Sequence, residues 1–371
     1  MGYFPVDGEN IWHMNNAVRL RNLLFKVALC SLSVSAPRVV ASNGITEVRN
    51  DLGFQCSKFR SQSNVTSERV SKTNDKDSMQ AILDDNTQVE KVADGFDFIE
   101  GPLWHPKGFL LFSDIPANTI YRWTPNEKVG VFRHPSGNAN GNTLDREGRL
   151  ISAEHGNRRV SRTLEDGTVV TLASQYEGKR LNSPNDVVVK SDGSIYFTDP
   201  PYGIKSEQEE LGFYGVYRIA SDGKLTLLVR DFVRPNGIAF SPDEKKLYID
   251  DSEKGHIRVF DVKPDGTLDN GRIFAELKDP SKQGVPDGMK VDTIGNVYST
   301  GPGGVWVFSP SGNLLGKIDV PEVTTNLAWG ISAQVSAQEA RDYKTLYITA
   351  NKSLYRIRLK IPGVRPGEMK R

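Results

Sequence analysis

The sequence predicts an all-β protein, a six-bladed β-propeller of four-stranded antiparallel blades preceded by a disordered N-terminal leader. A short pattern that opens with an oxygen-bearing side chain recurs six times, at steps of 40, 45, 51, 51 and 39 residues. Two further apolar runs follow each copy, and Asp-Gly or Ser-Gly pairs separate many of these runs. A repeat of about 40–50 residues that is rich in short strands is typical of propeller blades, which contain four antiparallel strands each.

The first strand of each unit begins at the residue that opens the pattern, which we call the lead residue. Gly or Asp usually follows it, and a hydrophobic run comes next. The six lead residues are Glu100, Asn140, Asn185, Asn236, Asp287 and Asn326. Since every one of these side chains carries an oxygen atom, a radial repeat would gather six oxygen donors around its centre.

The other strands follow each lead residue in a constant order. A second apolar run begins roughly ten residues later, as at Ile195–Asp199, and a third follows, as at Val216–Ile219. Their alternation of apolar and polar residues indicates half-buried strands. A hairpin pair such as Asp222-Gly223 then precedes a fourth strand, as at Leu225–Leu228. We therefore expect four strands in each unit and no helix inside the propeller.

The last unit lacks an obvious fourth strand, because the chain turns to Pro and Gly after Leu359. Residues 88–93, just ahead of the first lead residue, would fill this place. We predict that this N-terminal strand completes the sixth blade and closes the ring; the alternative is a flanking strand outside the repeat. The predicted boundaries are 1–85 for the leader, 86–362 for the propeller and 363–371 for a C-terminal tail.

The leader differs in composition from the rest of the chain. Residues 10–46 contain no acidic residue, and Val27–Ala36 is a short apolar stretch that ends in small residues. Read from Met14, this resembles a secretory signal peptide, although Lys26 counts against it; an organellar transit peptide and a mis-started extension remain alternatives. Residues 37–85 indicate a disordered linker. The protein would be periplasmic or secreted with a signal peptide, and otherwise cytoplasmic or organellar.

Composition excludes several classes of partner. The net charge of +1 favours neither nucleic acid nor an anionic membrane surface, and no apolar run approaches the ~18 residues of a membrane span. Both cysteines, Cys30 and Cys56, lie in the leader, so disulfides are not expected in the propeller. The oligomeric state is left open.

Common catalytic motifs are missing from the sequence. It contains no phosphate-binding Gly-rich loop, no His-Glu-x-x-His zinc motif and no Gly-x-Ser-x-Gly nucleophile elbow. The five histidines are scattered without the spacing of zinc ligands. Oxygen donors are more suitably placed than the histidines, because all six lead residues carry a side-chain oxygen.

The lead residues predict a site for a hard metal ion. In a propeller the starts of the innermost strands meet at one mouth of the central channel, so two carboxylates, Glu100 and Asp287, would face four amides. Such oxygen sets suit Ca²⁺ or Mg²⁺, with Mn²⁺ or Zn²⁺ as alternatives. A divalent ion can polarise an ester carbonyl, and a nearby carboxylate can act as general base. The alternative is that Asn-Gly and Asp-Gly pairs only make turns, and it stays open for Asn140 and Asn326.

Two polar stretches near strand ends are candidates for substrate binding. One is Glu154–Arg159, which contains His155, and the other combines Lys179–Asp186 with Asp199–Gly203, which contains Tyr202. Side chains at the mouth could bind a hydroxylated substrate. A surface loop with hydrogen bonds between blades is the alternative for both stretches.

At residues 95–360 the sequence resembles the SMP-30/gluconolactonase/luciferin-regenerating (regucalcin-like) family, and most closely its bacterial-type gluconolactonase branch. The motifs that carry the resemblance are Ile99–Trp104, Glu154–Arg162, Arg180–Asp186, Phe197–Gly203, Pro235–Phe240 and Pro286–Val291. The resemblance implies a six-bladed propeller with one divalent ion in the channel.

The resemblance also assigns roles to single residues. It implies Glu100, Asn236 and Asp287 as metal ligands, with Asn185 near both metal and substrate, and Asp287 as the general base. The regucalcin branch has a substrate-holding Arg two residues before the Asn that matches Asn185. In this chain that position is Ser183, so substrate contacts differ. We expect Asn140, Asn185, His155 and Tyr202 to contact the substrate.

The predicted function is a metal-dependent lactonase that hydrolyses a sugar lactone such as glucono-1,5-lactone to its aldonic acid. One divalent cation, with Ca²⁺ as the expected ion, would polarise the carbonyl. Asp287 would activate a water molecule, and the cation would lower the pKa of the Asp287 carboxyl group. Two alternatives remain. The propeller could be a non-catalytic binding scaffold, or a different hydrolase or strictosidine-synthase-like enzyme that lacks this Glu/Asn/Asp set.

Overall fold

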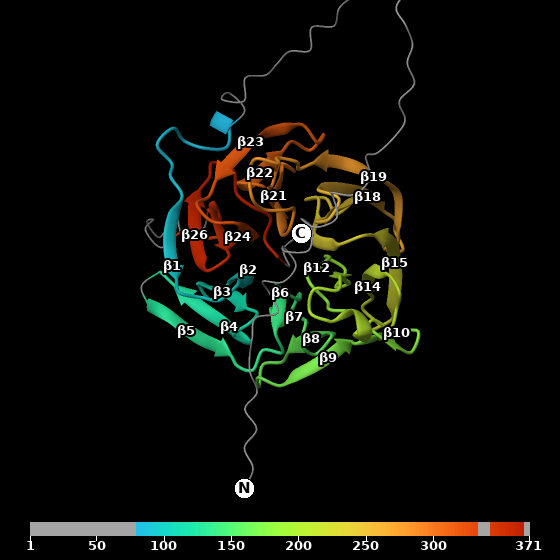
Figure 1. Ribbon diagram of the computed structural model, residues 1–371. Coiled ribbons are helices and arrows are strands. Elements are labelled where there is room, and N and C mark those ends of the chain that lie inside the picture. The colour runs from blue at the N-terminus through green and yellow to red at the C-terminus, as the bar shows by residue number, and fades with distance from the viewer. Residues whose placement is uncertain (1–78, 126, 333–341, 367–371) are drawn as a thin grey trace, which may run out of the picture. The chain divides into compact units, whose positions relative to one another are not determined.

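The structure is a computed structural model that describes residues 79–125, 127–332 and 342–366, without the side chains of residues 127 and 128. Six four-stranded antiparallel sheets surround a common centre (Figure 1). The first strands of neighbouring sheets contact one another all the way around this centre. The prediction of a six-bladed β-propeller is confirmed. The leader up to residue 78, with both cysteines and the candidate signal peptide, lies outside the described residues.

The strands of each blade follow one another from the innermost, at the channel, to the outermost. The first three blades are β2 (Ile99–His105), β3 (Phe109–Asp114), β4 (Thr119–Thr124) and β5 (Glu127–Arg133); β6 (Ala139–Leu144), β7 (Leu150–Glu154), β8 (Arg159–Thr163) and β9 (Val169–Ala173); and β12 (Val187–Val189), β13 (Ile195–Asp199), β14 (Tyr214–Ile219) and β15 (Leu225–Phe232). The next two are β16 (Pro235–Phe240), β17 (Lys246–Asp251), β18 (His256–Val262) and β19 (Leu268–Glu276); and β20 (Met289–Val291), β21 (Val297–Gly301), β22 (Gly304–Phe308) and β23 (Leu314–Asp319).

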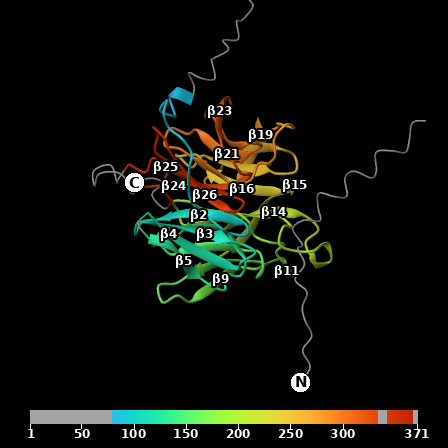
Figure 2. The ribbon, with the colours of Figure 1, turned by 60° about the vertical axis from the view of Figure 1, so that its left-hand side comes forward.

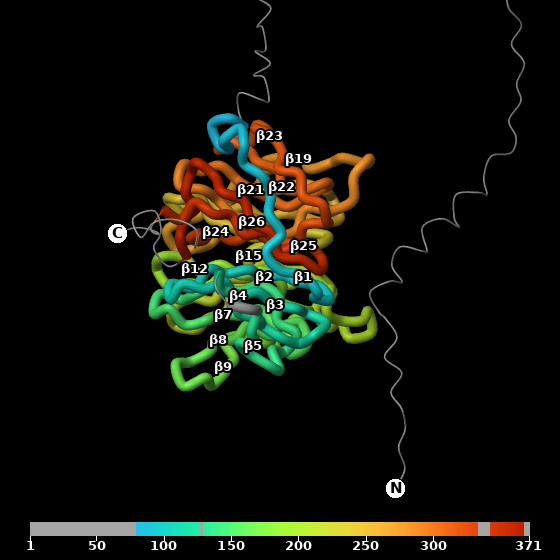
Figure 3. The backbone as a smooth tube through the Cα atoms, turned by 90° about the vertical axis from the view of Figure 1, so that its left-hand side faces the viewer, coloured from blue at the N-terminus to red at the C-terminus, as the bar shows by residue number. Residues whose placement is uncertain are grey.

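The sixth blade joins the two ends of the described chain. It consists of β24 (Thr324–Gly330), β25 (Thr345–Ala350), β26 (Ser353–Arg358) and the N-terminal β1 (Glu90–Asp94). β1 pairs antiparallel with β26, and Figure 3 shows it passing along the outside of this blade. The prediction that an N-terminal strand closes the ring is confirmed. In Figure 2 the first blade lies beside the sixth, in agreement with the contacts between β2 and β24.

The ordered unit extends beyond both predicted boundaries of the propeller. Ile82, which the sequence placed in the leader, is buried, and its carbonyl oxygen accepts a hydrogen bond from the Lys360 backbone N–H at 2.8 Å. At the other end, the N–H of Val364 donates to the carbonyl oxygen of Val291 at 3.2 Å. Residues 79–85 and 363–366 therefore pack against the blades.

Each interface between blades is filled by side chains of the second strands. Four of the six second strands bury a tyrosine ring at the same position, namely Tyr196, Tyr248, Tyr298 and Tyr347. Burying a large side chain of this kind contributes about 1.5–3 kcal/mol. These regularly spaced rings hold the blades in place, and the channel geometry depends on them.

An acidic residue at the end of a second strand fixes where the first strand of the same blade begins. The carboxylate of Asp114 accepts backbone N–H groups of Asp97 at 3.0 Å and Phe98 at 3.2 Å. Asp251 does the same for Val233 at 2.8 Å and Arg234 at 3.2 Å. The acids that end these strands thus anchor the loops that lead into Glu100 and Asn236.

In the part of the chain that the structure describes, no helix has the length and hydrophobicity needed to cross a membrane.

Candidate functional site

The structure brings the lead residues together at the starts of the innermost strands. The Asn140 amide Nδ2 donates to Asn185 Oδ1 at 2.6 Å, and the Asn185 Nδ2 donates to Asn236 Oδ1 at 2.5 Å. On the other arc, Asn326 Nδ2 donates to Glu100 Oε2 at 2.9 Å. Residues up to 226 positions apart in sequence thus contact one another directly.

The pairs that contain Gly do not form turns. Gly101, Gly141 and Gly237 all lie within strands, where the pairing with the second strand shifts register. A Cβ on Gly101 would lie 2.0 Å from the Asn140 carbonyl oxygen, and one on Gly237 would lie 2.0 Å from that of Asp287. Glycine is needed because the backbone of the next blade packs against it, so the turn interpretation is wrong at these positions.

Glu100 has one carboxylate oxygen fixed and one free. Oε2 accepts the Gly101 backbone N–H at 2.7 Å as well as the Asn326 amide. Oε1 is buried without a hydrogen-bond partner in the described residues. Burial raises the pKa of Glu100 to about 7, the two hydrogen bonds oppose this shift, and the charge of Asp186 adds to it. An unpaired buried carboxylate oxygen is costly, which makes this atom a natural ligand.

Asp287 shares the electrostatic environment of Glu100. Asp287 retains partial exposure at the mouth of the channel. Desolvation, followed by the charges of Glu100, Asp250 and Asp186, raises the pKa of the Asp287 carboxyl well above its ordinary value. A bound cation would relieve this mutual repulsion of the carboxylates.

His155 lies beside the amide arc of the ring. Its Nε2 atom is 3.3 Å from Asn140 Nδ2 and 3.1 Å from Asn185 Oδ1. Burial lowers the pKa of His155 to about 4, so its ring is neutral near pH 7. The structure therefore groups three of the predicted substrate contacts, Asn140, Asn185 and His155.

Tyr202 completes this group from a loop between β13 and β14. The Asn236 amide Nδ2 donates to the Tyr202 hydroxyl at 3.4 Å and to Ser252 Oγ at 3.0 Å. Ser183, which replaces the arginine of the regucalcin branch, supports this loop: its Oγ accepts the Gly203 N–H at 2.8 Å and donates to a carbonyl oxygen. The Arg234 guanidinium lies 5.6 Å from the centre of the Tyr202 ring.

Comparison with known proteins identifies the family of this chain. Residues 98–352 match the family described as the SMP-30/Gluconolactonase/LRE-like region. The chain belongs to this family. It is 35% identical over 315 residues to a gluconolactonase of Zymomonas mobilis, covering 77% of this chain and 85% of that protein. A pentonolactonase of Haloferax volcanii is 26% identical over 258 residues, covering 67% and 80% respectively.

A solved gluconolactonase structure from Xanthomonas campestris supports the assignment to the bacterial gluconolactonase branch of the SMP-30/gluconolactonase family. It superposes with a TM-score of 0.68 at 35% identity, and the match covers 76% of this chain and 92% of that one. The recognition made from the motifs is thereby confirmed.

Several polar residues of this family site are not among those predicted from the sequence. Asp250 Oδ1 accepts the Gly237 N–H at 3.1 Å, while its buried Oδ2 has no partner in the described residues. Ser252 Oγ donates to the Pro286 carbonyl oxygen at 2.6 Å, just before Asp287. Lys290 Nζ reaches Asn326 Oδ1 at 3.3 Å. Their signal was weak, because each lies within an ordinary strand pattern rather than at a lead position.

The residues present suit an oxygen-liganded cation. Within the described ranges, no group of three or more His, Cys, Asp or Glu side chains is arranged to hold a metal ion. The candidate set has only two carboxylates, and amide oxygens supply the rest. Glu100 Oε1 and Asn140 Oδ1 are both buried and without a partner in the described residues, and such hard oxygen donors fit Ca²⁺ or Mg²⁺.

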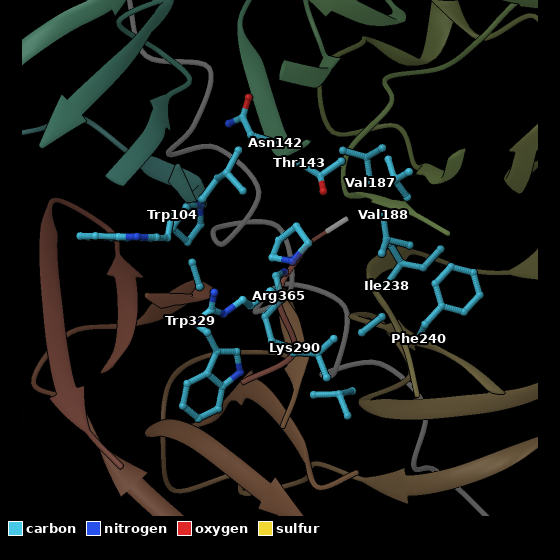
Figure 4. A pocket seen from close by; sticks show the side chains of 18 of the residues that line it. Trp104, Asn142, Thr143, Val187, Val188, Ile238, Phe240, Lys290, Trp329 and Arg365 are labelled. Atoms are coloured by element: carbon cyan, nitrogen blue, oxygen red, sulfur yellow. The ribbon is translucent and has the colours of Figure 1, made fainter. Parts of the chain in front are cut away.

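A largely apolar pocket lies among the innermost strands (Figure 4), and none of the six lead residues lines it. Its volume is about 70 Å³, and its walls include Trp104, Ile238, Phe240 and Trp329. Residues 364–366 line its outer end. Lys290 borders this pocket with its stem and reaches the lead residues with its ammonium group. Asn142, Thr143 and Arg365 also line the pocket, so its walls are mainly but not wholly apolar.

Proposed function

We propose that this protein is a metal-dependent lactonase that opens a sugar lactone such as glucono-1,5-lactone to its aldonic acid. Similarity over most of its length to a gluconolactonase and a pentonolactonase supports the general activity, hydrolysis of a lactone ester. The observation that carries the proposal is the pairing of Glu100 and Asp287 with amide side chains at one mouth of the channel.

Four side chains would hold the divalent cation: Glu100 through Oε1, Asn185 and Asn236 through their amide oxygens, and Asp287. Ca²⁺ is the expected ion, with Mg²⁺, Mn²⁺ and Zn²⁺ as alternatives. When bound, such a cation supplies polarisation of the lactone carbonyl. Its positive charge also opposes the repulsion that raises the pKa of Asp287, which favours the ionised carboxylate.

Asp287 acts as the general base. Its carboxylate accepts a proton from the water whose oxygen attacks the lactone carbonyl carbon. The ring C–O bond then breaks, and the departing ring oxygen takes the proton back from the Asp287 carboxyl group to become a hydroxyl group, which regenerates the carboxylate. Ser252, whose Oγ donates to the Pro286 carbonyl oxygen, helps hold the backbone that carries this base.

The remaining polar groups orient the sugar. Neutral His155, with Asn140 and Tyr202, offers donors and acceptors that match the hydroxyl groups of a lactone. Arg234 adds a guanidinium next to Tyr202, and it lies two residues before Asn236. We propose that it serves as a cationic contact that Ser183 in the neighbouring blade cannot supply.

A non-catalytic scaffold is the less favoured interpretation of the same fold. Propellers host many binding functions, but binding alone does not require two mutually repelling carboxylates at the channel mouth.

The test is a panel of aldonolactones assayed after chelation and after addition of Ca²⁺, Mg²⁺, Mn²⁺ or Zn²⁺. We expect activity to vanish on chelation and to return with at least one ion. Asp287→Ala should lower kcat by at least about 10³-fold, because general-base catalysis contributes 10²–10⁴-fold. Asp166→Ala, in an exposed hairpin turn, is the matched control. Full activity in the presence of chelator, or in the Asp287→Ala variant, would refute the mechanism.

A further inference from the structure

The amide of Asn326 has a fixed orientation. Its Oδ1 atom accepts the Leu327 backbone N–H at 2.8 Å and the Lys290 ammonium at 3.3 Å. An amide oxygen has two lone pairs, so both are occupied. Its Nδ2 atom must therefore face Glu100, where it donates to Oε2 at 2.9 Å.

This arrangement distinguishes Asn326 from Asn236. Asn236 Oδ1 accepts a hydrogen bond from Asn185, and its second lone pair has no donor among the hydrogen bonds of the described residues. At Asn326 the Lys290 ammonium already uses the lone pair that coordination of a metal ion would require. A divalent ion there would face a positive charge across a few ångströms, which is unfavourable.

The consequence of this orientation falls on Glu100. Two donors, the Gly101 N–H and the Asn326 amide, hold Oε2. With that oxygen held, the carboxylate cannot rotate freely, and the unpartnered Oε1 keeps one direction. Partners that orient a metal ligand typically change metal affinity by 10–100-fold when removed.

We propose that Asn326 is a positioning residue rather than a metal ligand: Lys290 and the Leu327 N–H fix its amide, and the amide aims the Glu100 carboxylate at the cation. The six lead residues then comprise four candidate ligands, one orienting residue, Asn326, and one residue that contacts the sugar, Asn140. This inference rests on the proposed function, since it assumes that a cation binds at Glu100.

Lys290→Met provides a test, because two explanations predict opposite changes in the affinity for a divalent cation. Methionine keeps an unbranched apolar stem beside the pocket but removes the donor and the charge. If Lys290 acted only through its charge, removing it would tighten the binding of a divalent cation. If Lys290 positions Asn326, its removal weakens binding, by about 3–10-fold, and Lys290→Arg restores most of the affinity. Calorimetric titration of the metal-stripped full-length protein with Ca²⁺ measures this without any assay of turnover.

Asn326→Leu provides the second measurement. We expect Ca²⁺ affinity to fall by about 10–100-fold, but to change less than about 3-fold when the same substitution is made in a Glu100→Gln background. Equal losses in both backgrounds would identify Asn326 as an independent ligand and overturn the inference. Thermal unfolding of each metal-free variant shows whether it is folded. If Asn326→Leu does not fold, the comparison of Lys290→Met with Lys290→Arg decides whether Asn326 is a positioning residue.

Metal binding by the wild-type protein and by Lys290→Met separates failure of the proposed function from failure of the positioning role of Asn326. Wild-type protein that binds none of the four divalent cations would overturn the metal-dependent function together with this inference. Wild-type protein that binds Ca²⁺, with tighter binding by Lys290→Met, would overturn the positioning role alone.

Discussion

At the scale of single residues, the candidate site shows what a sequence pattern can and cannot predict. The lead positions stand out because they recur. Their residue types, two acids and four amides, predict an oxygen-donor site for a cation. The directions of the hydrogen bonds do not follow, because they depend on how neighbouring blades pack. Asn326 is the example: its place in the ring was predictable, but its partner Lys290 lies in a strand with no distinguishing pattern.

The close approach at Gly237 gives a prediction at this scale. An added methyl group would lie 2.0 Å from the Asp287 carbonyl oxygen and 2.7 Å from Asp250 Oδ2. Gly237→Ala must therefore displace the base. We expect kcat/KM to fall by about 100-fold, since misplacement by about 1 Å can cost that much.

Gly130→Ala is the matched control, because no atom lies within 4 Å of an added Cβ there. Steady-state kinetics and Ca²⁺ titration of both variants check the prediction. Unchanged kinetics in Gly237→Ala would show that the backbone of the fifth blade yields without consequence to the site.

At the scale of elements, the strands were predictable and their anchors were not. Alternation and Asp-Gly pairs identify the strands, although inner strands such as β6 and β16 are buried along their whole length. The acids at the ends of second strands, such as Asp114 and Asp251, also recur, but their role as acceptors for the preceding loop requires the fold. A carboxylate at a strand end looks the same whether it faces solvent, backbone or a metal.

Asp199, another of these strand-end acids, should make stability depend on pH. Burial raises the pKa of Asp199 to about 7, although the Asn182 N–H donates to it at 2.8 Å. The unfolded value is near 4, so the folded state holds the proton more tightly. The contribution of this group to stability is therefore greatest below about pH 4 and is lost as pH rises to about 7.

Asp199→Asn removes this titration. The unfolding free energy of Asp199→Asn relative to wild type should rise with pH by about 1.4 kcal/mol per unit inside that window and level off above it. Urea unfolding at pH 5, 6, 7 and 8 measures the difference. A difference that does not vary with pH would show that Asp199 is ionised throughout.

At the scale of the whole molecule, β1 holds the ring closed. It pairs with β26, and Glu90 lies 2.8 Å from Arg356 across the outer edge. A chain that begins at residue 95 would lose this strand and leave β26 as an exposed edge, which promotes aggregation. We expect its thermal midpoint to fall by more than about 10 °C.

A chain that begins at residue 79 is the control, because it keeps every contact of β1 and of Ile82. Thermal unfolding and size-exclusion chromatography compare the two truncations. Equal stability of both would show that β1 contributes little to closure.

The joining of first and last blades has a consequence for the order of folding. Glu100 receives its amide from Asn326, and Thr325 Oγ1 donates to the Ile99 carbonyl oxygen at 2.7 Å across 226 positions. Contacts so distant along the chain form late and slowly. During synthesis or refolding, catalytic competence should therefore arrive in one step, at the end. A propeller whose last blade has not yet docked would lack these contacts, so the recovery of activity during refolding should report completion of the ring.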